Sequence, residues 1–587
     1  MLRGPGGAAP VADRAATHGR FVATFGRMSR FLATLLESAT GPDGSARGMT
    51  TGEPREPVRR SWAEVHGTAR GIADALRRPG DDGGPALPFG GAVGVLAGEP
   101  AAIAPAAQAV WLCGGSVTML HQPTPRTDLA EWAADTVATL TMIDAAMVLL
   151  GPPFDALAPV LTERGIPFRM LDSLTGDPTA FVADAAVADE GDTALLQLTS
   201  GSTAAPKAVR ITHANLHANI GAMVTASALD VATDRMVSWL PLFHDMGMVG
   251  FLTVPMTVGL DLVTVTPADF LGRPRLWAEL ISSYRGTVTA APNFAYAVLA
   301  RQLARVDDGA LDLSTLRIAL NGAEPVDPAA VAAFTDAGAR FGLRPESVLC
   351  AYGMAETALG VSFAPVHTGL TVDRVDAESL ESHRRAEPAG AGPVREFPEL
   401  GPPLPGIEVK VVGSGGRVLG PREVGVMHLR GDAVTPGYLT VDGPVPTQDR
   451  DGWFDTGDEG YLTPEGAVVV CGRTKDVIIM GGRNIYPTDI ERAAGAAEGV
   501  RAGNVVAVRM AAGQGRHRES FAVAVEARGD TDADTVRRIR DDVIRRVVSA
   551  VGVRPAEVAV LAPGSLPKTP SGKLRRAATA DLLTARR

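Results

Sequence analysis

Cysteine is scarce in this chain of 587 residues, which has three: Cys113, Cys350 and Cys471. Their wide spacing fits neither a disulfide framework nor a metal site, and it favours a reducing, cytoplasmic compartment. An excess of positive charge is also lacking, because the formal net charge is −10. Nucleic-acid binding needs a dense basic surface, so we expect no such partner. The apolar stretches are too short for a signal peptide or a membrane span, and we predict neither.

What the chain does have is an ordinary globular composition, with 45% hydrophobic and 21% charged residues. Its length predicts roughly two to four domains. Residues 1–18 are rich in Gly, Ala and Pro, which predicts a disordered lead. Helix-like stretches then alternate with strand-like runs, for example 62–76 before 91–96, and 136–146 before 147–150. This alternation predicts an α/β fold with a largely parallel sheet.

Four further apolar runs end near polar or Gly-rich turns, at 194–198, 236–240, 288–290 and 316–321. We expect each to be a strand followed by a helix. In open α/β sheets, ligands bind where loops leave the carboxyl ends of the strands. We therefore expect the functional residues on these loops.

The later part of the chain changes character. Residues 370–398 are rich in Glu, Arg, Pro and Gly, which predicts a surface insertion, and short strands from 407 onward predict a small β-rich subdomain. After residue 472 the pattern becomes α+β, with strands at 505–508 and 521–525 and a helix at 532–549. We expect a large N-terminal domain over 19–472 with parallel sheets and the β-rich subdomain, then a small mobile α+β domain over 475–587.

A hydroxyl-rich loop directly follows the apolar run at 194–198. It reads Thr199-Ser200-Gly201-Ser202-Thr203-Ala204-Ala205-Pro206-Lys207. Hydroxyls, backbone N–H groups and one lysine on a loop suit a polyphosphate. The loop is not a Walker A motif, because the Gly-Lys-Ser/Thr ending is absent.

Six further motifs follow this loop in order: 239–247, 321–324, 352–356, 453–458, 472–476 and 570–573. With these seven motifs in register, nearly the whole chain after residue 190 resembles the adenylate-forming superfamily of acyl-CoA synthetases, carrier-protein adenylation domains and luciferases. Within it, segments 239–247, 290–296 and 321–326 resemble the fatty acyl-AMP ligase branch. The long stretch between Tyr352 and Val409 also places the insertion where that branch carries one.

The resemblance implies a role for each matching residue. The phosphates would be held by Thr199, Ser200, Gly201, Ser202, Thr203 and Lys207. The rest of the nucleotide would be held by Gly322, Ala323, Glu324, Tyr352, Gly353, Asp458 and Arg473, with Tyr352 stacked on adenine and Asp458 accepting from the ribose hydroxyls. The acyl pocket would include His244, Met246, Asn293 and Phe294, with His244 as its gate. Glu356 would hold Mg²⁺.

The C-terminal domain supplies the remaining implied roles. Lys573 would neutralise charge between the substrate carboxylate and the α-phosphate, while Lys475 would be the hinge. Rotation about this hinge would replace Lys573 by the loop that begins with Gly481 and Gly482, which would line the thiol channel. The implied reaction joins an apolar carboxylic acid to a thiol through an acyl-AMP intermediate, with ATP or acyl-AMP, Mg²⁺, and CoA or a carrier protein's phosphopantetheine as cofactors.

Two departures from the family pattern bear on this reaction. Ala204 and Ala208 stand where the family's phosphate loop usually has glycine. An alanine held at left-handed φ costs about 1–2 kcal/mol. Our hypothesis is that ATP-dependent adenylation is impaired, in which case a separate adenylating enzyme would supply acyl-AMP.

The thiol acceptor has two candidates on the sequence. The insertion favours a carrier protein, because in the fatty acyl-AMP ligase branch it is thought to hinder the rotation that CoA requires. The small Gly481 resembles CoA ligases, and on this ground we favour CoA, with a carrier-loading fatty acyl-AMP ligase as the alternative. A different class of function is a non-catalytic homologue that only binds acyl-adenylate.

Two other patterns are given structural interpretations. His213 and His217 stand four residues apart with no third ligand evident, so we expect no metal there. The segment 413–416 has a dinucleotide-loop composition but precedes a strand-like run, so we predict a hairpin turn.

Overall fold

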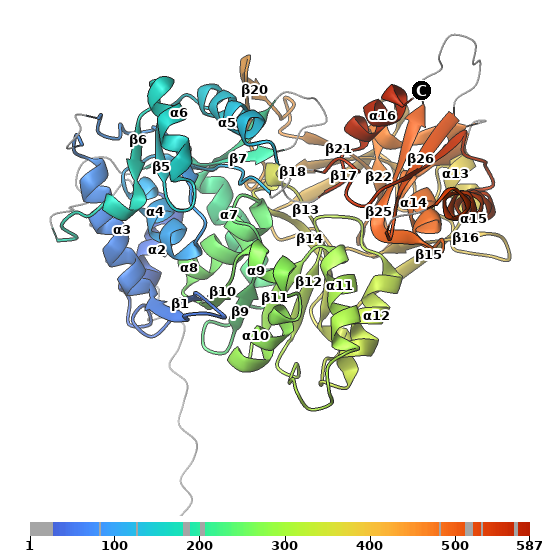
Figure 1. Ribbon diagram of the computed structural model, residues 1–587, viewed down its shortest axis with the longest axis horizontal. Helices are drawn as coiled ribbons and strands as arrows, with labels where there is room; N and C mark the ends of the chain where they lie inside the picture. The colour runs from blue at the N-terminus through green and yellow to red at the C-terminus, as the bar shows by residue number, and fades with distance from the viewer. Residues whose placement is uncertain are drawn as a thin grey trace, which may run out of the picture.

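Two eight-stranded sheets make up most of the N-terminal part of the computed structural model (Figure 1). The structure describes residues 28–80, 84–124, 127–179, 188–199, 206–480, 483–510, 520–529, 532–568 and 573–586. The predicted lead over 1–18 lies outside these residues. Within them, no helix is both long enough and apolar enough to cross a membrane.

The first sheet has the order β14-β13-β12-β11-β9-β10-β1-β2. Every pairing from β13 to β1 is parallel, and an antiparallel strand closes each edge. Its strands are β1 (Gly48–Thr51), β2 (Val58–Ser61), β9 (Arg235–Ser238), β10 (Asp261–Thr264), β11 (Val288–Ala291), β12 (Ile318–Asn321), β13 (Val348–Gly353) and β14 (Gly360–Phe363). The predicted largely parallel sheet is confirmed here.

The second sheet has the order β20-β19-β8-β7-β4-β3-β5-β6. Its strands are β3 (Ala92–Leu96), β4 (Ser116–Met119), β5 (Ala145–Leu150), β6 (Phe168–Met170), β7 (Thr193–Thr199), β8 (Lys207–Thr212), β19 (Gly437–Thr440) and β20 (Gly443–Pro446). One expectation is wrong: β7 is followed by the antiparallel strand β8, with Thr199 opposite Lys207, and not by a helix. The apolar residues Val209 and Ile211 of β8 are buried. β8 also pairs with β19 and so continues the second sheet beyond β7.

Helices cover the two sheets, as Figure 1 shows. They are α2 (Arg30–Thr40), α3 (Trp62–Leu76), α4 (Pro100–Leu112), α5 (Leu129–Met142), α6 (Ala158–Glu163), α7 (His213–Ala226), α8 (Val254–Val258), α9 (Pro267–Gly272), α10 (Leu276–Tyr284), α11 (Asn293–Leu303) and α12 (Pro328–Ala339). The helix predicted at 62–76 is confirmed, and a capping box between Ser61 and Glu64 fixes its start. The helix predicted at 136–146 instead begins at Leu129, because Asp128 caps its first backbone N–H groups.

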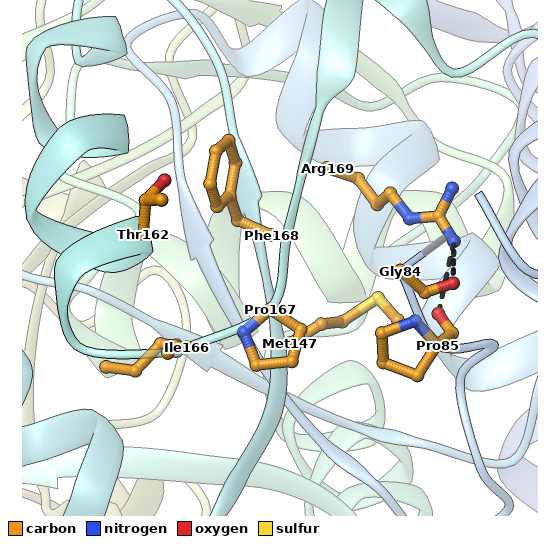
Figure 2. Close-up of a pocket in the computed structure, with 9 residues that line it drawn as sticks. Gly84, Pro85, Met147, Thr162, Ile166, Pro167, Phe168 and Arg169 are labelled. Carbon is orange, nitrogen blue, oxygen red and sulfur yellow. Dashed lines mark hydrogen bonds between the residues drawn. The ribbon is translucent and has the colours of Figure 1, made fainter. Parts of the chain in front are cut away.

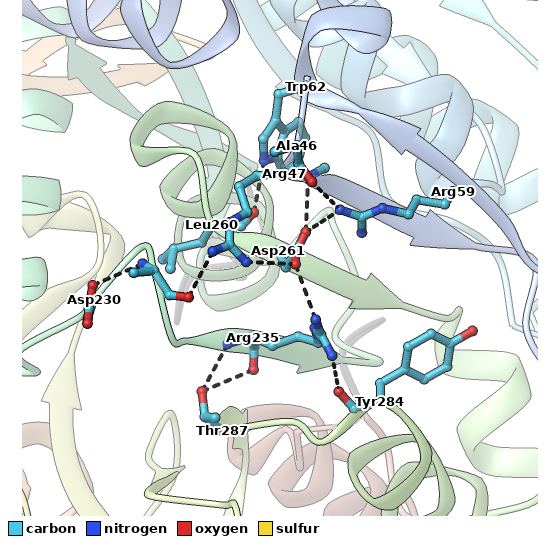
Figure 3. A network of polar contacts seen from close by, with 12 residues as sticks. Ala46, Arg47, Arg59, Trp62, Asp230, Arg235, Leu260, Asp261, Tyr284 and Thr287 are labelled. Atoms are coloured by element: carbon cyan, nitrogen blue, oxygen red, sulfur yellow. Dashed lines mark hydrogen bonds and ion pairs between the residues drawn. The ribbon is translucent and has the colours of Figure 1, made fainter. Parts of the chain in front are cut away.

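One buried carboxylate attaches the β1–β2 hairpin to the first sheet (Figure 3). Asp261 of β10 accepts from Arg59 at 2.7 Å and from the backbone N–H of Gly48 at 3.1 Å. Arg47 and Arg235 reach its other oxygen at 3.3 and 3.4 Å. These four donors satisfy a carboxylate that would be costly to bury unpaired, so the strand pairing of β1 with β10 is reinforced by charge.

The predicted β-rich subdomain is an antiparallel sheet of order β17-β18-β21-β22. Its strands are β17 (Glu408–Val412), β18 (Gly425–Arg430), β21 (Phe454–Leu462) and β22 (Val468–Arg473). Residues 413–416 form a turn after β17, with Gly415 and Gly416 at positive φ. The hairpin interpretation of this segment is therefore confirmed.

The C-terminal part folds around a three-stranded sheet, shown in orange and red in Figure 1. Its elements are β23 (Ile478–Met480), β24 (Arg483–Ile485), α14 (Pro487–Gly495), β25 (Val500–Met510), β26 (Ser520–Ala527), α15 (Ala533–Val551), β27 (Glu557–Leu561) and α16 (Arg576–Ala585). The predicted strands and helix of this region are each present. The short helix over Thr474–Asp476 precedes β23 and contains Lys475.

The insertion has more structure than its composition suggested. It consists of β15 (Val372–Asp376), α13 (Ala377–His383) and β16 (Val394–Pro398), with the two strands paired antiparallel. Buried side chains of the insertion, among them Leu380 and Phe397, join one hydrophobic cluster with Tyr461 of β21 and Tyr486 beside α14. The insertion is thus packed against both the β-rich subdomain and the start of the C-terminal part.

A buried ion cluster strengthens this contact. Glu381 of α13 accepts from Arg483 of β24 at 2.8 Å and from Arg395 of β16. Arg395 also pairs with Asp489 of α14. Because Glu381 and Arg395 are buried, separating these partners would leave charges uncompensated in a poorly solvated place.

Candidate active site

The predicted site residues gather where the carboxyl ends of strands from both sheets meet. Asn321 ends β12, Gly353 ends β13, and Thr199 ends β7. Ser200, Gly201, Ser202 and Thr203 lie outside the described residues, as do Gly481 and Gly482. The other predicted residues belong to the described part, so their mutual geometry can be examined.

The first group surrounds Glu356. Its Oε1 accepts from the Tyr438 hydroxyl at 2.7 Å and lies 3.9 Å from the Lys207 ammonium. Lys207 also sits over the Tyr438 ring, 3.8 Å from its centroid. Burial lowers the pKa of Lys207, while Glu356 opposes that shift. A half-buried cation and a carboxylate are thereby held side by side at the end of the hydroxyl-rich loop.

Thr199 contributes an unusual atom to this end of the site. Its hydroxyl oxygen is buried and has no hydrogen-bond partner in the described part of the chain. Most buried polar groups have a partner. A hydroxyl without one, at the last residue of the strand before a predicted phosphate loop, fits an oxygen-rich ligand.

Ala208 does not carry the strain that the sequence led us to expect. It lies in β8, opposite Leu198 and Leu439, in extended backbone, and it is absent from the residues with positive φ. Its side chain is buried in an apolar cluster with Leu196 and Leu198. The backbone-strain reasoning is wrong at this position, and Ala204 lies outside the described residues.

The second group surrounds Asp458. Its Oδ2 accepts from the Tyr352 hydroxyl at 2.6 Å, and its Oδ1 pairs with Arg473 Nε at 2.8 Å. Burial raises the pKa of Asp458, against the opposing effect of Arg473. Strand pairing places Asp458 directly opposite Arg473. The three residues predicted for adenine and ribose therefore form one hydrogen-bonded unit.

The neighbouring backbone allows close approach. At Gly322 a Cβ atom would stand 3.0 Å from the carbonyl oxygen of Ala351, and at Gly353 it would stand 2.2 Å from that of Leu359. Ala323 adopts a φ of 66°, which is uncommon for a residue with a side chain. A side chain at position 353 would therefore clash with the backbone. At Gly322 the absence of a side chain lets β12 and β13 lie close together.

The third group surrounds His244. Its Nδ1 lies 2.5 Å from Asp245 Oδ1, and the ring of His121 packs edge-on against Phe243. Burial alone would raise the pKa of Asp245, but His244 and Lys573 lower it. Asp245 and His121 are missing from our predicted set. Asp245 lies inside a motif that we quoted, and His121 follows β4, so the strand-end rule could have found both.

A π-helix over Met246–Thr253 continues from this group. The Thr253 hydroxyl donates to the carbonyl oxygen of Met248, five residues earlier. π-helices are rare and often mark functional sites. The wider turn sets Met246, a predicted acyl-pocket residue, directly after the His244–Asp245 pair.

The fourth group connects Glu324 with the start of α11. Glu324 accepts from the backbone N–H of Phe294 at 2.7 Å, and Asn293 accepts from the side chain of Asn321 at 3.1 Å. Burial raises the pKa of Glu324, while Lys573 and Lys568 oppose the shift. Lys573 is thus among the charges that act on both Glu324 and Asp245.

A separate hollow of about 250 Å³ lies elsewhere, beside β6 at the edge of the second sheet (Figure 2). Met147, Phe168 and Arg169 contribute to its lining. The guanidinium of Arg169 donates to the carbonyl oxygens of Gly84 and Pro85. None of the predicted site residues lines this hollow, and its one cation already has backbone partners, so the strand ends remain the candidate active site.

Comparison with known proteins identifies the family of the chain. Residues 46–439 match the model of a family described as AMP-binding enzyme. The chain belongs to this family. Since the family is adenylate-forming, the predicted superfamily is confirmed.

Individual relatives narrow the branch. The chain is 55% identical over 559 residues to Rv1013 of Mycobacterium tuberculosis (strain ATCC 25618 / H37Rv), covering 95% of this chain and 100% of that protein. It is 33% identical over 411 residues to the long-chain-fatty-acid–AMP ligase FadD28 of the same strain, covering 66% and 70%. A structure from studies of fatty acyl-adenylate ligases of E. coli and L. pneumophila superposes with a TM-score of 0.84 at 29% identity, covering 95% and 98%. This chain is therefore an AMP-binding ligase similar to fatty acyl-AMP ligases.

The half-buried His121 should make the stability of this AMP-binding ligase depend on pH. Burial, with a contribution from His244, lowers the pKa of His121 from 6.5 to about 4. Between these values a proton binds the unfolded chain but not the folded one, so stability should fall as the pH falls from about 6.5 to about 4.

A His121→Gln variant should lose part of this pH dependence, measured as the thermal unfolding midpoint across the same window. His213 also has its pKa lowered to about 4, but it is present in both proteins, so the difference isolates His121. If the unfolding midpoint changed equally with pH in wild type and variant, the pH dependence could not be attributed to His121.

Proposed function

We propose that this chain activates an apolar carboxylic acid as its acyl-AMP and passes the acyl group to a thiol. The observation that carries this proposal is the unit of Asp458, Tyr352 and Arg473, which suits a ribose, together with the paired Lys207 and Glu356, which suit phosphates and Mg²⁺. Lys573 of the C-terminal part is among the charges that act on Asp245 and Glu324 near the ends of the N-terminal strands. A cation at that place suits the negative charge that develops between a carboxylate and a phosphate.

The proposed reaction has two halves. In the first, a carboxylate oxygen of the acid attacks the α-phosphorus of ATP, and the bond to the bridging oxygen of the β-phosphate breaks, releasing pyrophosphate. In the second, a thiol sulfur attacks the acyl carbon, the bond to AMP breaks, and the thiol proton passes to solvent. The chain forms no covalent intermediate, so its contribution is positioning and charge stabilisation.

The described residues fit the nucleotide that the family implies. The unpartnered hydroxyl of Thr199 and the ammonium of Lys207 would contact phosphate oxygens. The carboxylate of Asp458 would accept from ribose hydroxyls beside Arg473. Glu356 would hold Mg²⁺, which prefers carboxylate, water and phosphate oxygens. When bound, Mg²⁺ would neutralise phosphate charge.

We further propose that the chain divides near Lys475 into two mobile domains. Lys475 lies in a single short helix between β22 and β23, so few backbone hydrogen bonds oppose rotation there. An arrangement with Lys573 near the strand ends would suit the first half-reaction. Rotation would withdraw Lys573 and bring the loop containing Gly481 and Gly482 to the acyl-AMP for the second.

A Lys573→Ala variant tests the function directly. Pyrophosphate release with ATP and acid should fall by about a hundredfold or more, in the range seen when one transition-state donor is removed. Transfer of acyl groups from preformed acyl-AMP to a thiol should be unchanged, because that half does not use the lysine.

The matched control for this experiment is Arg546→Ala. Arg546 is a cation of the same domain that pairs with Asp542 within α15 at 3.0 Å. It should have little effect on pyrophosphate release. Equal loss of both half-reactions in the Lys573 variant would contradict the assigned role. A wild-type chain that is inactive with acyl-AMP and with both thiols would favour the non-catalytic homologue.

Between the two thiol acceptors, one structural observation supports a carrier protein. Ion pairs connect the insertion to the C-terminal part. They join Glu381 and Arg395 of the insertion to Arg483 and Asp489. Such a cluster opposes the domain rotation that CoA is thought to need. FadD28 and the superposed ligases are named as fatty acyl-AMP ligases, which is consistent with the same choice. The reason for favouring CoA rests on Gly481, which lies outside the described residues.

Supplying CoA and a phosphopantetheinylated carrier separately to preformed acyl-AMP should show transfer to the carrier. A Glu381→Gln variant should transfer acyl groups to CoA faster than wild type, because its ion pair with Arg483 of the C-terminal part is lost. Glu423→Gln, which alters the exposed pair with Arg417, is the control and should change neither rate. A wild type that uses CoA as fast as the carrier would overturn the preference.

The hypothesis of impaired adenylation now depends on Ala204 alone. Replacing Ala204 by glycine should raise pyrophosphate release about tenfold if relief of strain is worth about 1.4 kcal/mol. Ala208→Gly is the matched control and should give no gain, because Ala208 is extended and its methyl group is buried among apolar neighbours. A fast wild type that gains nothing from Ala204→Gly would remove the hypothesis and the need for a separate adenylating enzyme.

A further inference from the structure

Tyr438 contacts both members of the Glu356–Lys207 pair. Its hydroxyl donates to Oε1 of Glu356 at 2.7 Å, and its ring centroid lies 3.8 Å from the Lys207 ammonium. The ammonium itself lies 3.9 Å from the same carboxylate oxygen, which is beyond hydrogen-bond distance. Tyr438 therefore connects the two charges more closely than they contact each other. It belongs to none of the seven motifs in the sequence.

The two charged residues come from different sheets. Glu356 lies in a short helix (Ala355–Thr357) after β13 of the first sheet, whereas Lys207 begins β8 of the second. β19 pairs with β8 so that Tyr438 is opposite Val209, which makes Tyr438 and Lys207 diagonal neighbours on one face. The separation of the carboxylate from the ammonium thus depends on the links between the sheets, and the Tyr438 hydroxyl is such a link.

The backbone of Glu356 is anchored separately. Its carbonyl oxygen accepts from the backbone N–H of Thr435 at 2.7 Å. The hydroxyl of Thr435, which is fully buried, donates to the carbonyl oxygens of Arg210 and Gly437. None of these bonds uses the Tyr438 hydroxyl. Removing that hydroxyl should therefore release the side chain of Glu356 while its backbone stays in place.

The Tyr438 hydroxyl is a constant donor to the carboxylate. Burial and the charge of Glu356 both raise the pKa of Tyr438, so the phenol stays protonated at neutral pH. In the described part of the chain, no group donates a hydrogen bond to the other oxygen of Glu356, Oε2. The carboxylate is thus oriented through one oxygen, and the other is available to a cation. Removing a group that orients a metal ligand typically lowers metal affinity by about 10–100-fold.

We propose that Tyr438 is a positioning residue whose hydroxyl orients Glu356 for Mg²⁺ and whose ring seats Lys207 for the phosphates of ATP. This inference rests on the proposed function and adds a residue to its nucleotide site. The two contacts use different atoms of one side chain, so they can be removed one at a time. Tyr438→Phe removes the hydroxyl and keeps the ring, whereas Tyr438→Leu removes both.

The test measures by calorimetry the dissociation constant of α,β-methylene-ATP, an analogue that cannot release pyrophosphate, in Mg²⁺ and in EDTA. The ratio of the two constants gives the contribution of the metal to binding. In Tyr438→Phe this contribution should fall about tenfold, because Glu356 is no longer oriented. Affinity in EDTA should equal that of wild type, because the ring still seats Lys207.

Tyr438→Leu should show a second effect. Without the ring the Lys207 ammonium loses its cation–π contact, so affinity in EDTA should also fall, by about threefold to tenfold. A side chain that only supported the fold would not separate the metal-dependent loss from the metal-independent one.

The control is Tyr284→Phe. The Tyr284 hydroxyl donates to the carboxylate of Glu53 at 2.6 Å, and neither residue is among the predicted site residues. This variant loses a comparable hydrogen bond between a phenol and a carboxylate. It should leave both dissociation constants unchanged.

The outcomes are distinguishable. A metal-dependent loss in Tyr438→Phe, joined by a metal-independent loss in Tyr438→Leu, supports the inference. A metal contribution in Tyr438→Phe that equals or exceeds that of wild type overturns the role of the hydroxyl. Equal losses in EDTA for the two variants overturn the role of the ring. Failure of the wild type to bind the analogue in either condition overturns the proposed function itself.

Discussion

The hydrogen bond between Tyr352 and Asp458 is the contact on which the arrangement of the site depends. Tyr352 lies in β13 of the first sheet, whereas Asp458 lies in β21 of the small antiparallel sheet. Arg473 completes the unit from β22. Because Asp458 is buried and its two partners come from separate sheets, this one carboxylate fixes the β-rich subdomain against the strand ends that carry the other functional groups.

Much of the fold could be predicted from the sequence because its signals are local. The helix over Trp62–Leu76 has a capping box at its start, and the buried runs of β9, β11 and β12 are short and apolar between polar turns. Pairing is not local, and there the predictions failed. The residues between Thr199 and Lys207 do not indicate whether a helix or a strand follows. The strand β8 forms there because it pairs with β7 and β19.

The site shows the same division. Motif order brought together Glu356, Asp458 and Arg473, but Tyr438 was missed, because its contacts with Glu356 and Lys207 arise only when β19 pairs with β8. Ala208 was assigned backbone strain from its position in a motif, whereas its actual conformation follows from strand pairing. The insertion was interpreted from composition as surface, yet its few apolar residues suffice to join a core shared with Tyr461 and Tyr486.

The cluster around Glu381 has a thermal consequence. The cost of removing charged groups from water falls as temperature rises, because their hydration carries a strongly negative entropy. Contacts made of buried ions therefore weaken less on warming than most other links in the fold. The join between the insertion and the C-terminal part contains two arginines and two carboxylates in one place. The contact between the insertion and the C-terminal part should therefore loosen less on warming than a contact without buried ion pairs.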